Sequence, residues 1–219
     1  MSDFRKLIFA TPIYAAVSDN TAIQDLICRL VYKWKEDTID KAISLGIPQE
    51  KLSSYYWNLT AETGSRPDWK EFGMTTFYTG DLIKDPNWLP VKEFIENVSA
   101  SLLSEEHNGK TEITMMWATI YPKGAHVPEH IHNNSLFSGV YYAKTSPFCG
   151  NLIFKDPAYV GKTMASKLNP GFPSIPVVHE QEVENGLTII FPSWLPHSTQ
   201  SNGSDEDRII VSFNLNFPN

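Results

Sequence analysis

Residues 126–142 read His-Val-Pro-Glu-His-Ile-His-Asn-Asn-Ser-Leu-Phe-Ser-Gly-Val-Tyr-Tyr, a histidine cluster that leads into a predicted strand. The chain has six histidines, and three of them lie in the first seven of these positions. His130 and His132 are two residues apart, so on an extended strand they point to the same face. Both imidazoles could then bind one metal ion. His126 is better explained as a loop or surface residue, and Glu129 would face away from the pair.

His197 offers a third imidazole, in the stretch Phe-Pro-Ser-Trp-Leu-Pro-His that begins at residue 191. Strands that are distant in sequence can meet at one mouth of a small barrel. Two histidines from one strand end and one from a later strand would leave the other metal positions open, as in the two-His-one-carboxylate triad of non-haem iron enzymes. Here His132 stands where a carboxylate is expected. Either all three histidines bind the metal, which we favour because imidazole suits iron, or His132 is displaced and two protein ligands remain.

The second half of the chain predicts an all-β core. From residue 111 onward, short apolar stretches with β-type patterning are separated by Gly, Pro and Asn turns. Many short strands of this kind indicate a sandwich or barrel. We therefore predict a double-stranded β-helix (jelly-roll, cupin-like) core over 111–219, with strands at 112–121, 136–143, 151–154, 177–183, 187–191 and 208–217.

The first half predicts one strand and two helices. A strand over 6–17 is interrupted by Pro12, which fits an edge or a bulge, and residues 55–57 could form another strand. Apolar residues at helical spacing indicate an amphipathic helix that begins after the caps at 18–21 and ends before Gly46; they are Ile23, Leu26, Ile27, Leu30, Val31 and Trp34. A second helix is predicted after Asp85 and ends at Asn108. We expect a single domain, 1–219, in which residues 1–110 form a helical and β segment that packs on the core.

Composition excludes several classes of protein. Hydrophobic residues make up 42% and charged residues 20%, as in a soluble globular protein. The net charge of −7 and the lack of a basic cluster argue against nucleic-acid binding. No apolar stretch reaches the roughly 20 residues of a membrane span, and the first residues lack a secretory pattern. Cys28 and Cys149 have neither disulfide-framework nor zinc-ribbon spacing, so we expect a cytoplasmic protein. The sequence is compatible with an oligomer but does not indicate one.

The last predicted strand has two different faces. Ile209 and alternate residues after it are apolar, whereas the opposite face carries mainly polar side chains: Arg208, Ser212, Asn214 and Asn216. A polar face is expected if it is exposed to solvent. If it lines a cavity instead, it indicates groups that could bind a ligand. A guanidinium at Arg208 could form two parallel hydrogen bonds to a carboxylate, although a surface arginine is the simpler interpretation of this residue alone.

Together these stretches resemble the 2-oxoglutarate- and Fe(II)-dependent dioxygenases. The resemblance is nearest to the prolyl-hydroxylase-like branch, and within it to a family of uncharacterised oxygenases from bacteria and their phages. It covers about residues 112–217, and it depends on the order and spacing of short motifs: His130-x-His132, Ser138-Gly-Val-Tyr-Tyr142, Gly150-Asn-Leu-Ile-Phe154, Phe191-Pro-Ser-Trp-Leu-Pro-His197 and Arg208-Ile-Ile-Val-Ser-Phe-Asn214.

The resemblance implies roles for individual residues. His130 matches the first iron-binding histidine of the family's H-x-D motif, and His197 matches the distal one. His132 departs from the motif, which has a carboxylate there. Arg208 matches the basic residue that pairs with the distal carboxylate of 2-oxoglutarate. The other candidates for the cosubstrate pocket are Tyr142, Tyr121 and Ser212.

The implied activity is hydroxylation of a C–H bond in a small molecule or a peptidyl residue. Fe(II) would be the cofactor, 2-oxoglutarate and dioxygen would be cosubstrates, and succinate and CO2 would be released. Two alternatives remain open. A cupin-like metalloprotein, either a 2-oxoglutarate-independent dioxygenase or an isomerase, would leave Arg208 and Tyr142 without a shared ligand. A non-catalytic jelly-roll binding module would make the histidines structural.

Overall fold

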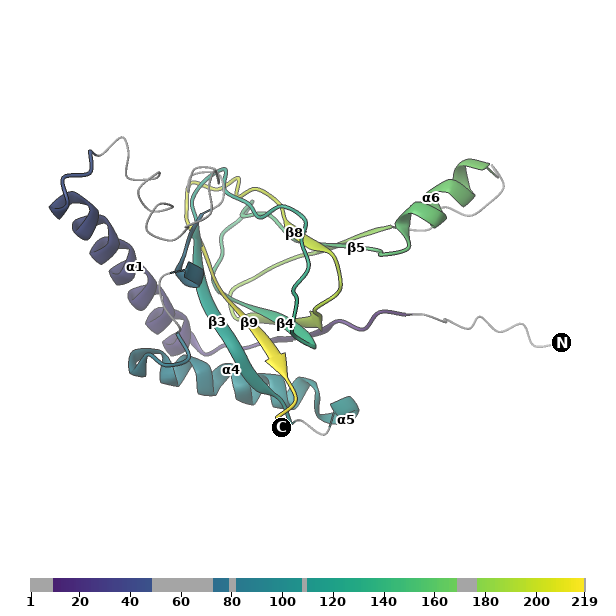
Figure 1. Cartoon of the computed structure of the whole chain (residues 1–219), viewed down its shortest axis with the longest axis horizontal. Coiled ribbons are helices and arrows are strands. Elements are labelled where there is room, and N and C mark those ends of the chain that lie inside the picture. The colour runs from purple at the N-terminus through teal and green to yellow at the C-terminus, as the bar shows by residue number, and fades with distance from the viewer. Residues whose placement is uncertain (1–9, 49–72, 79–81, 108–109, 169–176, 219) are drawn as a thin grey trace.

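The computed structural model describes residues 10–48, 73–78, 82–107, 110–168 and 177–218 (Figure 1). Its helices are α1 (Thr21–Ser44), α4 (Leu89–Leu102), α5 (Ser104–His107) and α6 (Tyr159–Leu168), with 3-10 turns η2 (Thr76–Tyr78) and η3 (Pro86–Trp88). Its strands are β1 (Tyr14–Val17), β2 (Met74–Thr75), β3 (Glu112–Tyr121), β4 (Phe137–Lys144), β5 (Leu152–Lys155), β6 (Val178–Gln181), β7 (Leu187–Pro192), β8 (His197–Thr199) and β9 (Arg208–Asn216).

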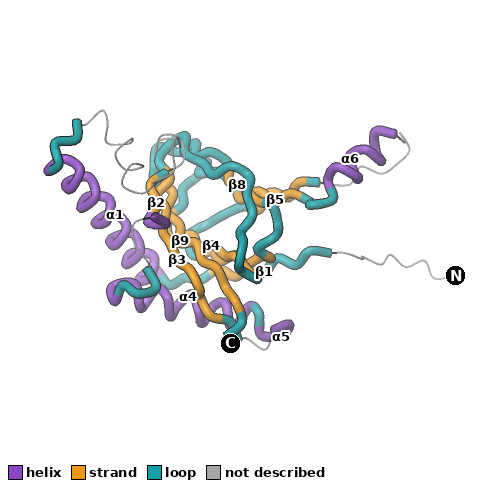
Figure 2. Tube along the Cα trace, in the orientation of Figure 1, coloured by secondary structure: helices purple, strands orange, loops and turns teal. Residues whose placement is uncertain are grey.

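The strands form two antiparallel sheets. The larger sheet has the order β1-β7-β4-β9-β3-β2, and the smaller one has the order β6-β5-β8. In Figure 2 the smaller sheet lies across from the larger one, while α1 and α4 lie on the other side of the larger sheet. A buried apolar cluster fills the space between the sheets and includes Val140, Phe154 and Ile189. This is the predicted double-stranded β-helix, whose interior we call the lumen.

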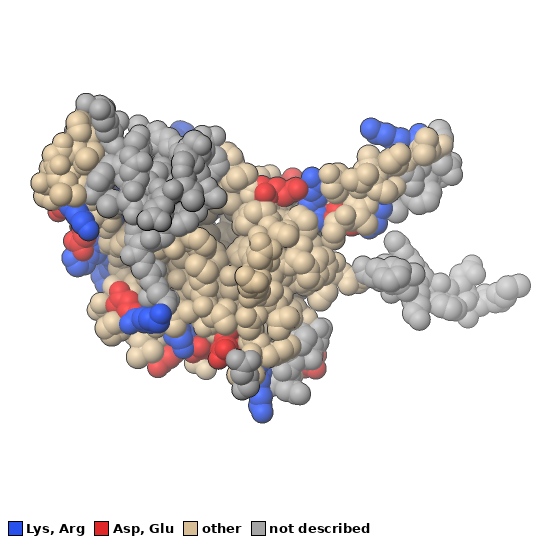
Figure 3. All heavy atoms as spheres, viewed as in Figure 1, with Lys and Arg blue, Asp and Glu red and all other residues tan. Residues whose placement is uncertain are grey.

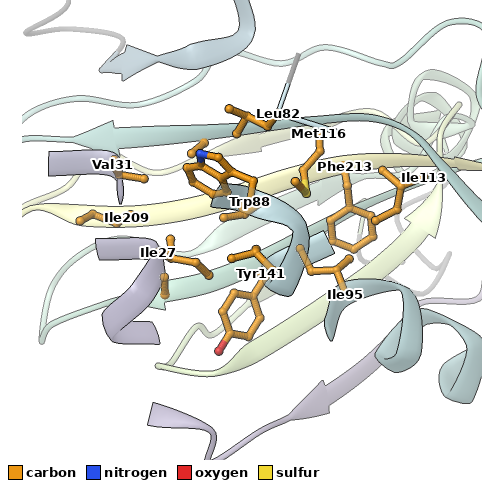
Figure 4. Packing of buried hydrophobic residues seen from close by; sticks show 14 of the residues in the cluster. Ile27, Val31, Leu82, Trp88, Ile95, Ile113, Met116, Tyr141, Ile209 and Phe213 are labelled. Atoms are coloured by element: carbon orange, nitrogen blue, oxygen red, sulfur yellow. The ribbon is translucent and has the colours of Figure 1, made fainter. Parts of the chain in front are cut away.

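A second apolar cluster joins the larger sheet to the helices. The outward residues of β9 pack against Ile27 of α1 and Ile95 of α4 in one cluster (Figure 4). Tyr141 of β4 meets Phe94 of α4 edge to face, with ring centroids 5.3 Å apart. Each helix therefore buries its apolar stripe on the sheet, as the periodicity predicts.

The two predicted long helices form for the expected local reasons. The side chain of Asn20 caps α1 by accepting a hydrogen bond from the Ile23 amide at 3.2 Å. Asp85 caps η3 in the same way, through the Asn87 amide at 2.9 Å. The second helix was predicted to continue to Asn108, but α4 ends at Leu102 and α5 is a separate short turn.

Several elements differ from the prediction. The first strand is shorter than 6–17, since β1 begins at Tyr14, after Pro12. The sequence pattern did not indicate β2, β8 or α6, and α6 points away from the rest of the molecule in Figure 1. The possible strand at 55–57 lies outside the described residues.

The visible surface carries charges of both signs. In Figure 3, acidic and basic side chains are interspersed around the periphery, and the middle of the described surface is mostly uncharged. Among the described helices, none combines the length and the hydropathy required to cross a bilayer.

Gly139 lies where two central strands approach closely. It pairs with Phe213 of β9 and with Ile190 of β7. A Cβ atom at Gly139 would overlap the ring of Phe213, which is fully buried. The glycine in the Ser-Gly-Val-Tyr-Tyr motif is therefore a packing requirement of the sheet.

We expect Gly139→Ala to lower the free energy of unfolding by about 1–3 kcal/mol, because it overpacks the core. Gly161 in α6 is the matched control, since nothing lies within 4 Å of its added Cβ. Gly161→Ala should raise the free energy of unfolding by about 0.4–1 kcal/mol. Urea unfolding of both variants measures the difference, and changes of the same sign would contradict this account.

Candidate metal centre

Backbone hydrogen bonds hold two distant segments of the chain together at one end of the lumen. His130 and His197 exchange two backbone hydrogen bonds of 3.0 Å each, an isolated β-bridge. On either side, the His132 amide donates to the Ser193 carbonyl and the Thr199 amide donates to the Val127 carbonyl, both at 3.0 Å. We expected His130 and His132 on extended strand backbone. Apart from the bridge at His130, this segment is a loop, and the loop brings the same side chains together.

The three imidazoles converge. The ligand atoms of His130, His132 and His197 all lie within 4.8 Å of one another. The rings of His130 and His197 are closest, with centroids 4.2 Å apart. On the far side of each ring, Nδ1 is hydrogen-bonded to an oxygen: His130 to Pro128 O at 2.9 Å, His197 to Leu195 O at 2.9 Å, and His132 to Asn214 Oδ1 at 2.7 Å.

These contacts determine which ring nitrogen carries the proton. Carbonyl and amide oxygens only accept hydrogen bonds, so each Nδ1 is protonated and each Nε2 of a neutral ring has a free lone pair. The Nε2 atoms of His130 and His132 face each other at 3.3 Å. Two lone pairs at this distance repel each other, and a cation between them would turn the repulsion into attraction. The donor set therefore fits a divalent metal ion.

Burial favours the neutral imidazoles. It lowers the pKa of His197 to about 3, and the neighbouring His130 contributes to this shift. Burial likewise lowers the pKa of His130 and of His132. Neutral imidazole is the form that binds metals, so the structure provides the ligands in the required state.

The metal cluster found among the described residues contains histidines only. Glu129 forms an ion pair with Lys155 at 3.0 Å, so it does not supply the missing carboxylate. The ring of His132 lies beside the other two, with centroids 5.2 Å from His130 and 5.1 Å from His197. His126 is outside the cluster, as predicted.

Arg208 is 1% exposed and its side chain lies between the sheets. Its Nη1 donates to the carbonyls of Cys149 (2.7 Å), Gly150 (3.2 Å) and Gln200 (3.3 Å), and its Nη2 donates to Thr199 Oγ1 (3.1 Å). Within the described portion of the chain, its buried Nε has no hydrogen-bond partner. The polar face of the last strand therefore meets the lumen, and the guanidinium retains an unused donor there.

The three other pocket candidates also lie on the lumen side of the sheet. The guanidinium carbon of Arg208 stacks on the Tyr121 ring, 4.6 Å from its centroid. Burial raises the pKa of Tyr121 and of Tyr142, and the positive charge of Arg208 opposes both shifts. Both hydroxyls therefore stay protonated near the guanidinium. Ser212 is half-buried and pairs with Trp117 and Val140, nearer the middle of the strand.

Thr199 connects the histidine cluster to Arg208. It is two residues after His197 on β8, so the two side chains share a face at a spacing of about 6–7 Å. Thr199 Oγ1 accepts hydrogen bonds from Arg208 and from the Val127 amide. A short dicarboxylic acid could therefore reach from the histidines to the guanidinium.

Sequence reasoning missed residues behind the cluster. Asn214 is hydrogen-bonded to His132, and Ser138 donates to Asn214. Ser193 is hydrogen-bonded to Ser138 and to Ser135. Asn214, Ser138 and Ser193 are buried. The polar face of the last strand was the available signal, but only the folded chain shows that Asn214 reaches a histidine.

One family model matches the sequence of this region. Residues 115–214 match the family model described as "Putative 2OG-Fe(II) oxygenase". No curated protein sequence matches the chain.

Solved structures align with the chain to different extents. A prolyl-4-hydroxylase from Pseudomonas putida aligns with a TM-score of 0.52 and 14% identity over 93% of this chain and 92% of its own. A 2OG-Fe(II) oxygenase-family oxidoreductase from Burkholderia pseudomallei aligns with a TM-score of 0.46 and 9% identity over 59% of this chain; the aligned region spans 58% of that protein. HygX from Streptomyces hygroscopicus, crystallised with nickel and 2-oxoglutarate, aligns with a TM-score of 0.44 and 14% identity over 61% of this chain and 68% of its own.

The prolyl-4-hydroxylase alignment identifies the fold, and the residues matched by the family model include all three histidines and Arg208. Residues 115–214 thus match the model of the 2OG-Fe(II) oxygenase family.

Proposed function

We propose that this protein binds Fe(II) through His130, His132 and His197 and uses it, with 2-oxoglutarate and dioxygen, to hydroxylate a C–H bond. The observation that carries the proposal is the convergence of three unprotonated Nε2 atoms at one end of the lumen. Bound iron would supply the oxidising chemistry, in which 2-oxoglutarate is converted to succinate and CO2. The substrate class is a small molecule or a peptidyl residue.

Arg208 would hold the far carboxylate of 2-oxoglutarate. The Nη1 group is anchored by carbonyls and the ring of Tyr121 supports the guanidinium plane, so the side chain is fixed before any ligand arrives. Its Nε, which has no partner among the residues that the structure describes, is a donor for which an anion is a suitable acceptor. We assign Tyr142, Tyr121 and Ser212 to the same pocket, with Tyr142 and Tyr121 next to the guanidinium.

The walls of the lumen would exclude water from the reaction. Val140, Ile189 and Phe191 are buried on the larger sheet, and Leu152 and Phe154 are buried on the smaller one. A dry, low-dielectric pocket strengthens the attraction between Arg208 and a carboxylate. We also propose a cytoplasmic location, in keeping with the free thiols of Cys28 and Cys149.

Replacing a ligand tests the metal site. We expect His197→Ala to abolish Fe(II) binding and succinate formation, because the variant keeps only two of the three imidazole ligands. His179→Ala is the control, since His179 is an exposed histidine of the smaller sheet that stacks on Phe154 outside the cluster. Anaerobic titration with Fe(II) and an assay of succinate release give the readouts. Wild-type protein that binds no metal, or a His197→Ala variant that binds it normally, would refute the proposal.

Replacing Arg208 tests the cosubstrate. Arg208→Lys keeps the charge but removes the planar fork, so binding of 2-oxoglutarate to the nickel-loaded protein should weaken about 10–100-fold. Pyruvate has the same 2-oxo acid group but no distal carboxylate, and its weaker binding should not change between the two proteins. Calorimetric titrations of both acids measure this. Equal losses for the two acids would point to a structural role of Arg208, and no loss for either would exclude the contact.

A further inference from the structure

His132 differs from the other two histidines in what holds it. The Nδ1 groups of His130 and His197 donate to the backbone carbonyls of Pro128 and Leu195, which in each case lie two residues earlier in the sequence. The Nδ1 of His132 instead meets a side chain, Asn214 Oδ1, at 2.7 Å. Asn214 lies 82 positions away on β9. The orientation of this one ring therefore depends on a tertiary contact.

Asn214 itself belongs to a buried chain of hydrogen bonds. Its Oδ1 also accepts from Ser138 Oγ at 3.1 Å. Ser138 Oγ is 2.8 Å from Ser193 Oγ, which is 2.7 Å from Ser135 Oγ; the single hydroxyl proton of Ser193 can serve only one of these two contacts at a time. Ser135 donates to the carbonyl of Phe137 at 2.7 Å, which ends the chain at the backbone. Ser138, Ser193 and Asn214 are 0%, 1% and 8% exposed, so water has little access to compete for these bonds.

The orientation of the Asn214 amide decides whether His132 can bind a metal. With Oδ1 toward the ring, Nδ1 carries the proton and Nε2 is free. With the amide reversed, Nδ2 would donate to Nδ1, and the proton would move to Nε2. That Nε2–H would then point at the Nε2 of His130, 3.3 Å away, and the two histidines would hydrogen-bond to each other instead of to a cation.

We propose that Asn214 is a positioning residue that makes His132 a metal ligand by holding it as the Nδ1–H tautomer. The need for it follows from the histidine itself. Either oxygen of a carboxylate can bind a metal, whereas an imidazole must present the correct one of two nitrogens. A neutral third ligand therefore requires a fixed acceptor behind it. This inference rests on the proposed function, since it takes the three histidines as the ligands.

Three variants separate this role from simple packing. Asn214→Leu keeps the approximate volume but removes the acceptor. Asn214→Asp keeps an acceptor and cannot present a donor when ionised, so it enforces the Nδ1–H tautomer. Asn216→Leu is the matched control on the same face of the same strand, where Asn216 bonds Asn134 O and the Leu136 amide but no histidine.

Cobalt binding to the metal-free proteins gives a readout that does not depend on turnover. We expect Asn214→Leu to weaken Co(II) binding about 10–100-fold, the usual cost of losing the partner behind a metal-binding histidine. Asn214→Asp should bind Co(II) at least as tightly as wild type, with a shifted visible absorption spectrum because its charge reaches the metal through His132. Asn216→Leu should bind as wild type does.

Each other outcome overturns the inference. Wild-type affinity in Asn214→Leu would show that the acceptor is dispensable, and an equal loss in Asn216→Leu would show that the two asparagines only order the loop. A tenfold loss in Asn214→Asp would exclude tautomer control even if Asn214→Leu failed to fold. Absence of Co(II) binding by the wild-type protein would instead overturn the proposed function, and the inference with it.

Discussion

Strand β9 lies between two different environments, and the alternation of its side chains serves both. Successive residues of a strand point to opposite faces. One face, including Val211 and Phe213, packs under the helices, and the other places Arg208 and Asn214 in the lumen. A one-residue shift of register would exchange the two faces completely. The pairing of β9 with β3 and β4 therefore determines both the core and the position of the polar groups in the site.

The charges within the lumen favour anionic ligands. Three neutral imidazoles would leave the charge of a bound divalent ion uncompensated, and Arg208 adds a positive charge that bonds to carbonyls and a hydroxyl. A buried charge without a counter-ion is costly unless it is well hydrogen-bonded. The contacts to Arg208 reduce that cost without neutralising it. A dianion that reaches both groups would satisfy them together, which agrees with the family's use of 2-oxoglutarate.

The sequence predicts the elements of this structure that depend on local patterns. Period-two alternation located β3 and β9 nearly to the residue, and the caps at Asn20 and Asp85 located the helices. His130, His132 and His197 were predicted as a group by type and by resemblance, and the fold brings them together. The role of Asn214 was not, because it depends on a contact across 82 positions. Likewise β8 has only three residues and pairs only in the folded chain. Helix α6 has ten residues and leaves Val160, Met164 and Leu168 exposed, so the core does not determine its position.

The bridge between His130 and His197 has a consequence for how this site could change over evolutionary time. Its bonds join main-chain atoms, so they are indifferent to the side chains that they carry. The residue at position 132 is held in the same way, by a hydrogen bond from its amide to the Ser193 carbonyl. A carboxylate could therefore replace the histidine there without loss of these backbone hydrogen bonds. Such an exchange would remove the reason for an acceptor at position 214. In related chains, the residues at these two positions should therefore covary, although they lie far apart in the sequence.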